Sequence, residues 1–168
     1  MSQPDPSMSV VSDAETRAST DHHEALRLWL RMLAATGLVE QRIRKLLQER
    51  FGTTLPRFDL MSQLERAPDG LRMGELSQRM MVTGGNVTAI TDALEAEGLV
   101  IRVADPADRR AQRVRLTPMG RRAFQQMAVE HESWIVEAFA ELTPRDMQAL
   151  AQLLGRLKIR IRHLEQAE

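Results

Sequence analysis

Residues 83–92 carry short side chains whose hydroxyl and amide groups can form hydrogen bonds with an external partner. Asn86 offers an amide with both donors and acceptors, and Thr88 offers a hydroxyl. The neighbouring glycines have no side chain that would hold a partner away from the backbone. These groups suit the donor and acceptor pattern that base edges display in the major groove of duplex DNA. The candidate DNA-binding residues of this set are Thr83, Gly84, Gly85, Asn86 and Thr88.

A second set of candidate residues is cationic and lies in residues 99–122, which hold seven arginines against Asp105 and Asp108. Arginine pairs with phosphate oxygens and is the favoured side chain in a narrow minor groove, where the negative potential is strongest. The net charge of the whole chain is zero, with 23 basic and 23 acidic residues, so only the local distribution points to a nucleic acid.

The residues around the first set predict a helix that begins after an N-cap at Thr83 and ends at Gly98. Val87, Ile90, Thr91 and Leu94 fall on one side of this helix, which is the side expected to be buried. The opposite side has no long charged side chain in its first two turns, which is unusual for a face that only meets water. We therefore expect a partner to approach this face closely. Its residues are Gly85, Thr88, Ala89 and Asp92.

The cationic residues are expected on a β-hairpin. Residues 99–103 are β-branched, residues 104–108 have turn chemistry, and residues 112–116 alternate between polar and apolar side chains. This pattern places Arg109 and Arg110 at the tip of the hairpin. Two short helices followed at once by such a hairpin are typical of a winged helix-turn-helix.

The rest of the chain predicts a helical framework around this motif. Residues 1–20 are rich in Pro, Ser, Asp and Thr and read as a disordered tail. A helix of nearly 30 residues follows up to Phe51, which is long enough to suggest an element shared with a partner chain. Two more helices begin at Thr117-Pro118 and Thr143-Pro144. The predicted fold is mainly α with a small β-hairpin wing. A winged helix-turn-helix DNA-binding domain covers residues 56–116, and a helical dimerisation region covers residues 21–55 and 117–168.

Several other functions are disfavoured by what the sequence does not contain. The chain has no cysteine, no glycine-rich phosphate loop and no nucleophile elbow, so we expect neither an enzyme nor a cofactor. His22 and His23 are adjacent and point to different helix faces, so we expect no metal site. No apolar run is long enough to span a membrane, and we expect a cytoplasmic protein with no membrane partner.

These motifs together resemble the MarR family of winged-helix transcriptional regulators. The resemblance rests on Asn86-Val-Thr88, Leu94-Glu-Ala-Glu-Gly98, Asp105-Pro-Ala-Asp108-Arg109-Arg110 and Leu116-Thr-Pro-Met-Gly120. It implies a homodimeric repressor, and in many members of the family a small molecule, often aromatic, releases the repressor from its operator. Two-fold symmetry then predicts a palindromic operator on double-stranded DNA. The family's wing motif assigns Asp108 to holding the wing arginines by ion pairing. Either Arg109 or Arg110 would enter the minor groove.

A narrower resemblance connects Leu28-Trp29-Leu30-Arg31, residues 50–61 and residues 81–88 with the branch that senses hydroxycinnamoyl-coenzyme A thioesters, such as p-coumaroyl-CoA. It implies an aromatic slot beside cations that attract the nucleotide phosphates. Two alternatives remain open: the aromatic residues are ordinary core, and the same scaffold acts as a repressor without a small-molecule effector. The candidate effector residues are Arg27, Trp29, Arg31, Met32, Arg42, Arg44, Arg57, Phe58 and Met61.

Overall fold

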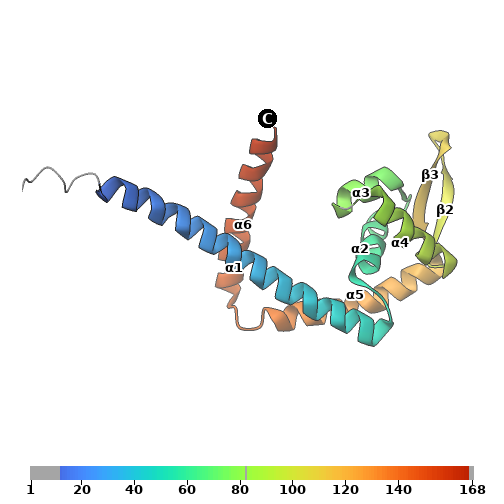
Figure 1. Ribbon diagram of the computed structural model, residues 1–168. Helices are drawn as coiled ribbons and strands as arrows, with labels where there is room; N and C mark the ends of the chain where they lie inside the picture. The colour runs from blue at the N-terminus through green and yellow to red at the C-terminus, as the bar shows by residue number, and fades with distance from the viewer. Residues whose placement is uncertain (1–11, 82, 167–168) are drawn as a thin grey trace, which may run out of the picture. The chain divides into compact units, whose positions relative to one another are not determined.

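The structure is a computed structural model that describes residues 12–81 and 83–166, and the chain divides into two compact units, Met1–Leu46 and Leu47–Glu168. Helix α1 (Ser12–Phe51) forms the described part of the first unit and ends in the second. The second unit then contains α2 (Leu55–Glu65), β1 (Leu71–Arg72), α3 (Met73–Met80), α4 (Gly84–Ala96), β2 (Val100–Asp105), β3 (Asp108–Leu116), α5 (Pro118–Ala138) and α6 (Pro144–Glu165). Figure 1 shows the β2–β3 hairpin projecting beside α3 and α4.

The three strands form one small antiparallel sheet in the order β1-β3-β2. Leu71 of β1 lies opposite Val114, and Val100 of β2 lies opposite Leu116. All four side chains are buried, so one face of the sheet closes the core of the second unit. The outer part of the hairpin extends beyond this core and ends in the two-residue turn between Asp105 and Asp108.

The helices of the second unit bury one side each against this sheet and against one another. Helices α2, α3 and α4 pack together in pairs. Burying a Leu or Val side chain fully stabilises the fold by about 1.5–3 kcal/mol, so these contacts fix the position of α4. The fully buried side chains of the three helices include Leu60, Leu64, Leu76, Val87, Thr91 and Leu94.

The junction between α4, β2 and α5 depends on two glycines. Gly98 ends α4 with a φ of +71°, a conformation that glycine adopts without steric cost. Thr117 caps α5 by accepting a hydrogen bond from the Gly120 N–H at 2.9 Å and donates its hydroxyl to the Gly98 carbonyl at 2.7 Å. A Cβ on Gly120 would lie 1.9 Å from the Leu99 carbonyl oxygen, so only glycine fits there.

The predicted fold class is confirmed: the chain is mostly helical with a small antiparallel sheet. The predicted caps at Gly98 and at Thr117-Pro118 are also found. The hairpin strands are longer than the sequence indicated, because β3 begins at Asp108. Arg109 and Arg110 therefore lie on β3 beside the turn.

Helix α1 begins at Ser12, before the boundary that the sequence analysis placed after residue 20. Ala14 and Ala18 are strong helix formers, and Asp13 and Glu15 suit the positive end of a helix, so the serines and threonines of this stretch misled the prediction. The prediction of a disordered tail otherwise falls on residues 1–11, which lie outside the described residues.

Replacing Gly120 with Ala should destabilise the second unit, because the new methyl group would collide with a backbone oxygen that cannot rotate away. Overpacking of this kind costs about 1–3 kcal/mol or more. We expect the midpoint of thermal unfolding to fall by several degrees. The control is Gly85→Ala, where a Cβ meets nothing within 4 Å and a stabilisation of about 0.4–1 kcal/mol is expected. Equal melting temperatures for the two variants would contradict this account.

Candidate nucleic-acid interface

Helix α4 presents one buried side and one bare side, as its sequence predicted. Val87, Thr91 and Leu94 are buried, whereas the four residues of the predicted bare face are exposed, namely Gly85, Thr88, Ala89 and Asp92. Gly84 and Asn86, in the first turn of the helix, are also exposed. The buried side holds the helix rigidly through the packing described above. The exposed side places the Asn86 amide next to short side chains, so a partner can come close to the helix backbone.

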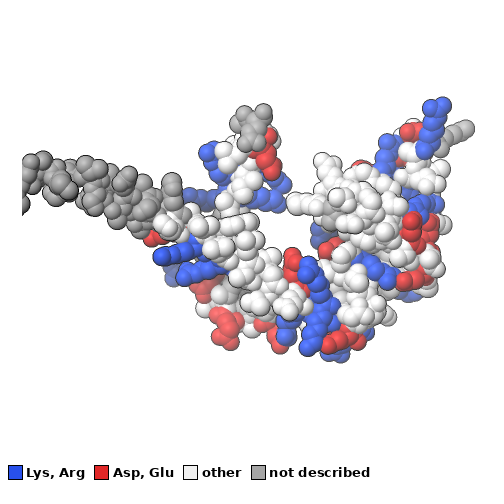
Figure 2. All heavy atoms as spheres, viewed as in Figure 1, with Lys and Arg blue, Asp and Glu red and all other residues white. Residues whose placement is uncertain are grey.

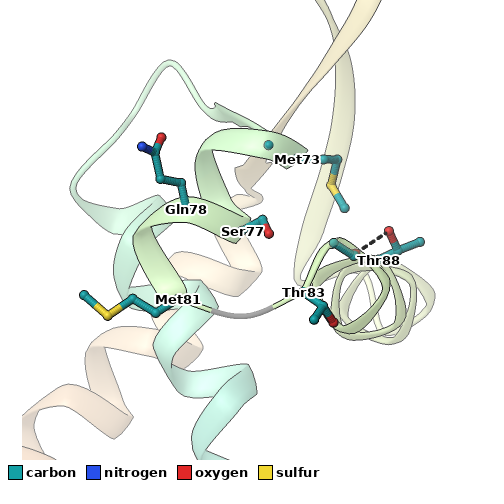
Figure 3. A pocket seen from close by; sticks show the side chains of 8 residues that line it. Met73, Ser77, Gln78, Met81, Thr83 and Thr88 are labelled. Carbon is teal, nitrogen blue, oxygen red and sulfur yellow. Dashed lines mark hydrogen bonds between the residues drawn. The ribbon is translucent and has the colours of Figure 1, made fainter. Parts of the chain in front are cut away.

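The hydroxyl groups at the start of α4 differ in how they are used. Thr83 stands at the N-cap, as predicted, but its side chain makes no capping hydrogen bond. The Thr88 hydroxyl donates to the Gly84 carbonyl oxygen at 3.0 Å, which Figure 3 shows as a dashed line. With its proton committed in this way, the Thr88 oxygen can still accept a hydrogen bond from a partner.

A notch of about 640 Å³ lies between α3 and α4 beside these residues. Figure 3 shows how α3 and the start of α4 border it. None of its lining residues is charged, so the notch offers apolar and hydroxyl groups to whatever approaches α4. The lining residues are Met73, Gly74, Ser77, Gln78, Met81, Thr83, Gly84 and Thr88.

The wing carries the predicted arginines at the start of β3. Arg110 is exposed, and its backbone N–H donates to the Asp108 carboxylate at 3.0 Å. Asp108 thus orders the backbone of the wing through this hydrogen bond. Its assignment to holding the wing arginines by ion pairing stays a prediction. The side chain of Arg109 lies outside the described part of the chain, so its role stays a prediction. Figure 2 shows cationic side chains at the far end of the hairpin.

The acidic residue that anchors the wing is Asp105, whose side chain is buried. One carboxylate oxygen accepts hydrogen bonds from Arg72 Nε at 2.7 Å and Arg113 Nε at 2.8 Å. The other oxygen accepts the backbone N–H of Ala107 at 2.8 Å. Arg113 also donates to the Gly70 carbonyl at 3.1 Å, which links the wing to the turn before α3. The hydrogen bond from Arg72 and that from Ala107 outweigh burial and hold the pKa of Asp105 far below its ordinary value.

A second ionic contact joins α4 to the base of the wing. Arg102 of β2 pairs with Asp92 at 2.5 Å and also with Glu95. These contacts raise the pKa of Arg102, and the largest cause is the hydrogen bond that Arg102 donates to Asp92. Asp92 is the one acidic residue predicted on the bare face of α4, so this pair neutralises a charge that would repel a phosphate backbone. The sequence analysis did not assign this role to Arg102.

The predicted effector residues fall in both units. In the second unit, Phe58 and Met61 are buried, and the Phe58 ring lies 5.4 Å from that of Phe124 and 4.7 Å from that of His131. Arg57 pairs with Glu97, and its Nε is buried with no hydrogen-bond partner. The burial of Phe58 and Met61 favours the core interpretation that the sequence left open. Assignment of these residues to an effector stays a prediction.

The other predicted effector residues lie on α1 in the first unit, where Trp29 is 53% exposed. Met32 is half-buried, and the four arginines are exposed, with Arg44 paired to Glu40 at 2.7 Å. These arginines are Arg27, Arg31, Arg42 and Arg44. The first unit thus presents aromatic and cationic side chains on one helix.

The described residues also bear on a metal site and on a membrane span. They contain no cluster of three His, Cys, Asp or Glu residues that could hold a metal ion. Among the helices described, none combines the length and apolar character needed to cross a bilayer.

Replacing Asp105 with Asn should loosen the wing and lower the thermal stability at neutral pH, because Arg72 and Arg113 would lose their charged partner. A carboxyl whose pKa is depressed in the folded state stabilises the fold above its unfolded pKa of about 4 and loses that contribution as the pH falls below it. The difference in melting temperature between the wild type and Asp105→Asn should therefore shrink below pH 4. A difference that stays constant from pH 7 to pH 3 would show that the Asp105 charge does not hold the wing.

Comparison with known proteins gives a consistent result for this arrangement. A profile described as MarR family matches residues 51–111. The chain is similar to YsmB, an HTH-type transcriptional regulator of Bacillus subtilis, with 29% identity over 143 residues that cover 85% of this chain and 95% of YsmB. A MarR family transcriptional regulator from Silicibacter pomeroyi is 33% identical, with a TM-score of 0.70 over 83% of this chain and 97% of that one. Sco3205, a MarR family regulator from Streptomyces coelicolor solved in complex with DNA, is 26% identical with a TM-score of 0.73, over 81% and 86% of the two chains.

Proposed function

The chain belongs to the MarR family of DNA-binding transcriptional regulators, and we propose that it is a repressor that binds a palindromic operator as a homodimer. In this proposal α4 enters the major groove and the wing contacts the adjacent backbone and minor groove. The observation that carries it is the bare, uncharged face at the start of α4 beside a wing that bears arginines. The relatives are transcriptional regulators, which supports a role other than catalysis, and binding to operator DNA would place the protein in the cytoplasm.

The chemistry of α4 supports direct reading of bases. An Asn amide can bond an adenine through N6 and N7, and a Thr hydroxyl can meet several base edges. Asn86 and Thr88 are both exposed on a helix whose other side is fixed in the core. The structure of Sco3205 with DNA shows that a relative of this fold binds a duplex. The pairing of Asp92 with Arg102 removes a repulsive charge from the same face.

The apolar surface of α6 supports the homodimer. None of the described α6 side chains is buried within the chain, although the helix carries a row of large apolar residues. A run of exposed large apolar side chains along one helix points to a protein partner. Two-fold symmetry would then set the operator half-sites about one helical turn, roughly 34 Å, apart. The exposed residues are Leu150, Leu153, Leu154, Leu157, Ile159, Ile161 and Leu164.

Binding to duplexes selected from a random library, measured across a salt series, tests this function. Replacing Arg109 and Arg110 with Ala should weaken binding and flatten the salt dependence, because each lost phosphate contact removes about 0.9 from the logarithmic slope. Asn86→Ala should instead blur the preferred sequence, with about 1–3 kcal/mol lost for a base contact and little change in slope.

Arg145→Ala on α6 is the matched control, since it removes an exposed arginine away from the wing and should leave the slope unchanged. Failure of the wild type to select any palindromic duplex would overturn the proposed function. Normal binding by the double arginine variant would overturn only the role of the wing.

Release by an aromatic effector is the finer part of the proposal, and the exposed Trp29 beside the arginines of α1 favours it. A hydroxycinnamoyl-CoA thioester offers an aromatic acyl group that can pack against Trp29 and phosphates that can pair with the arginines. The alternative is the same repressor without a small-molecule effector.

Calorimetric titration with p-coumaroyl-CoA, with the free acid and with coenzyme A separates these alternatives. If the thioester is the effector, it should bind and weaken operator affinity by about 5- to 150-fold, the usual range of coupling between sites. Arg31→Ala should weaken the thioester more than the free acid, because only the thioester carries phosphates. Absence of binding by all three ligands would favour the repressor without an effector.

A further inference from the structure

Met81 is the described residue whose presence is hardest to explain by the fold. Its side chain is 94% exposed, so it contributes almost no burial to the core. Its φ of 54° lies in the left-handed region, and it is the one non-glycine with a positive φ among the described residues. It occupies the C-cap of α3, where glycine is the usual residue because a Cβ is unfavourable there. The fold alone would favour glycine at this position.

The residues around Met81 form one uncharged surface that leads into α4. Met81 borders the notch between α3 and α4 together with Thr83 and Gly84, which belong to the proposed DNA-reading surface. In Figure 3 the Met81 side chain extends from the end of α3 instead of folding back onto α4. The adjacent Gly84 and Gly85 are also not required by packing, because a Cβ on either would meet nothing within 4 Å. Three residues that the fold does not need therefore lie together at the entrance to α4.

The chemistry of this surface selects among the parts of a duplex. The strongest contacts to a phosphate come from cations, and the residues that line the notch include none. The major groove presents one apolar group on its base edges, the C5-methyl of thymine. A methionine side chain is unbranched and polarisable, so it can adapt to such a group without a fixed pocket.

We propose that Met81 is a specificity-determining residue that contacts the C5-methyl group of a thymine in the operator. This inference rests on the proposed function, because it requires α4 to enter the major groove. Met81 borders the same notch as Thr83 and Gly84, so its side chain lies next to the first turn of α4, which would enter the groove. The unfavourable backbone conformation at Met81 is then retained for DNA recognition.

The test combines variants of the full-length protein with a single-methyl change in the DNA. A duplex selected by the wild type from a random library is resynthesised with each thymine replaced in turn by uracil, which removes only the C5-methyl group. For the wild type, each half-site should contain one thymine whose single replacement by uracil weakens binding about fourfold. This factor is equivalent to about 0.8 kcal/mol for one methyl-sized group. Met81→Gly should bind the thymine duplex more weakly than the wild type and should not distinguish it from the uracil duplex.

Two further variants separate DNA contact from effects on the fold. Met81→Gly should melt at the same temperature as the wild type or higher, because glycine removes the strain at a φ of 54°. Met81→Asn keeps a residue that tolerates this conformation and should also lose the thymine preference. Met119→Ala removes another exposed methionine, on α5, and this variant should retain the thymine preference.

Each outcome bears on one claim. If the wild type selects no duplex, the proposed function fails. If it selects one and Met81→Gly still distinguishes thymine from uracil as the wild type does, the inference about Met81 fails while the proposed function stands. Equal loss of affinity by Met81→Gly for both duplexes, with the thymine preference retained, would also overturn the thymine contact. Loss of both affinity and thymine preference, with unchanged melting, would support it.

Discussion

The buried carboxylate of Asp105 is the interaction on which the geometry of the second unit depends. It joins Arg72 at the start of α3, which is 33 residues away in the sequence, to the turn of the wing and to Arg113 on β3. A buried charge is unfavourable unless it is fully paired, and here both oxygens receive donors. The requirement to keep every donor in place gives the hairpin one orientation relative to α3. Without it, a two-stranded hairpin extending beyond the core would have little to hold it.

Arg102 extends the same constraint to α4. Its pairs with Asp92 and Glu95 connect the base of the wing to the helix that carries Asn86 and Thr88. Both ionic contacts are partly exposed, so each contributes little to stability. Their value is geometric, because the distance between the bare face of α4 and the arginines of the wing sets which parts of a duplex both can reach at once. The ion pairs therefore add a second link between α4 and the base of the wing to the one that the apolar core provides.

The parts of this architecture that follow from local chemistry could be predicted, and those that depend on distant contacts could not. Gly98, Thr117 and Pro118 have capping roles that are visible within a few residues, so the ends of α4 and α5 were correct. The alternation in residues 112–116 indicated β3, but its pairing with β1 depends on a two-residue strand that carries no pattern of its own. The resemblance to a family directed attention to Asp108, whereas burial selects Asp105. No spacing rule connects Asp105 with Arg72, which is 33 residues away.

The start of α4 departs from what folding alone would favour, and this departure is the basis for proposing it as a recognition surface. Residues chosen for folding would give a helix N-terminus good helix formers and a glycine at the preceding C-cap. The chain has the reverse arrangement, with Met81 at the C-cap and glycines at the first two positions of the helix. Each choice costs a fraction of a kcal/mol to about 2 kcal/mol, which is tolerable because the core beneath is well packed. The buried side of α4 thus provides the stability that allows its exposed side to be shaped for a ligand, and the two sides of one helix are under opposite demands.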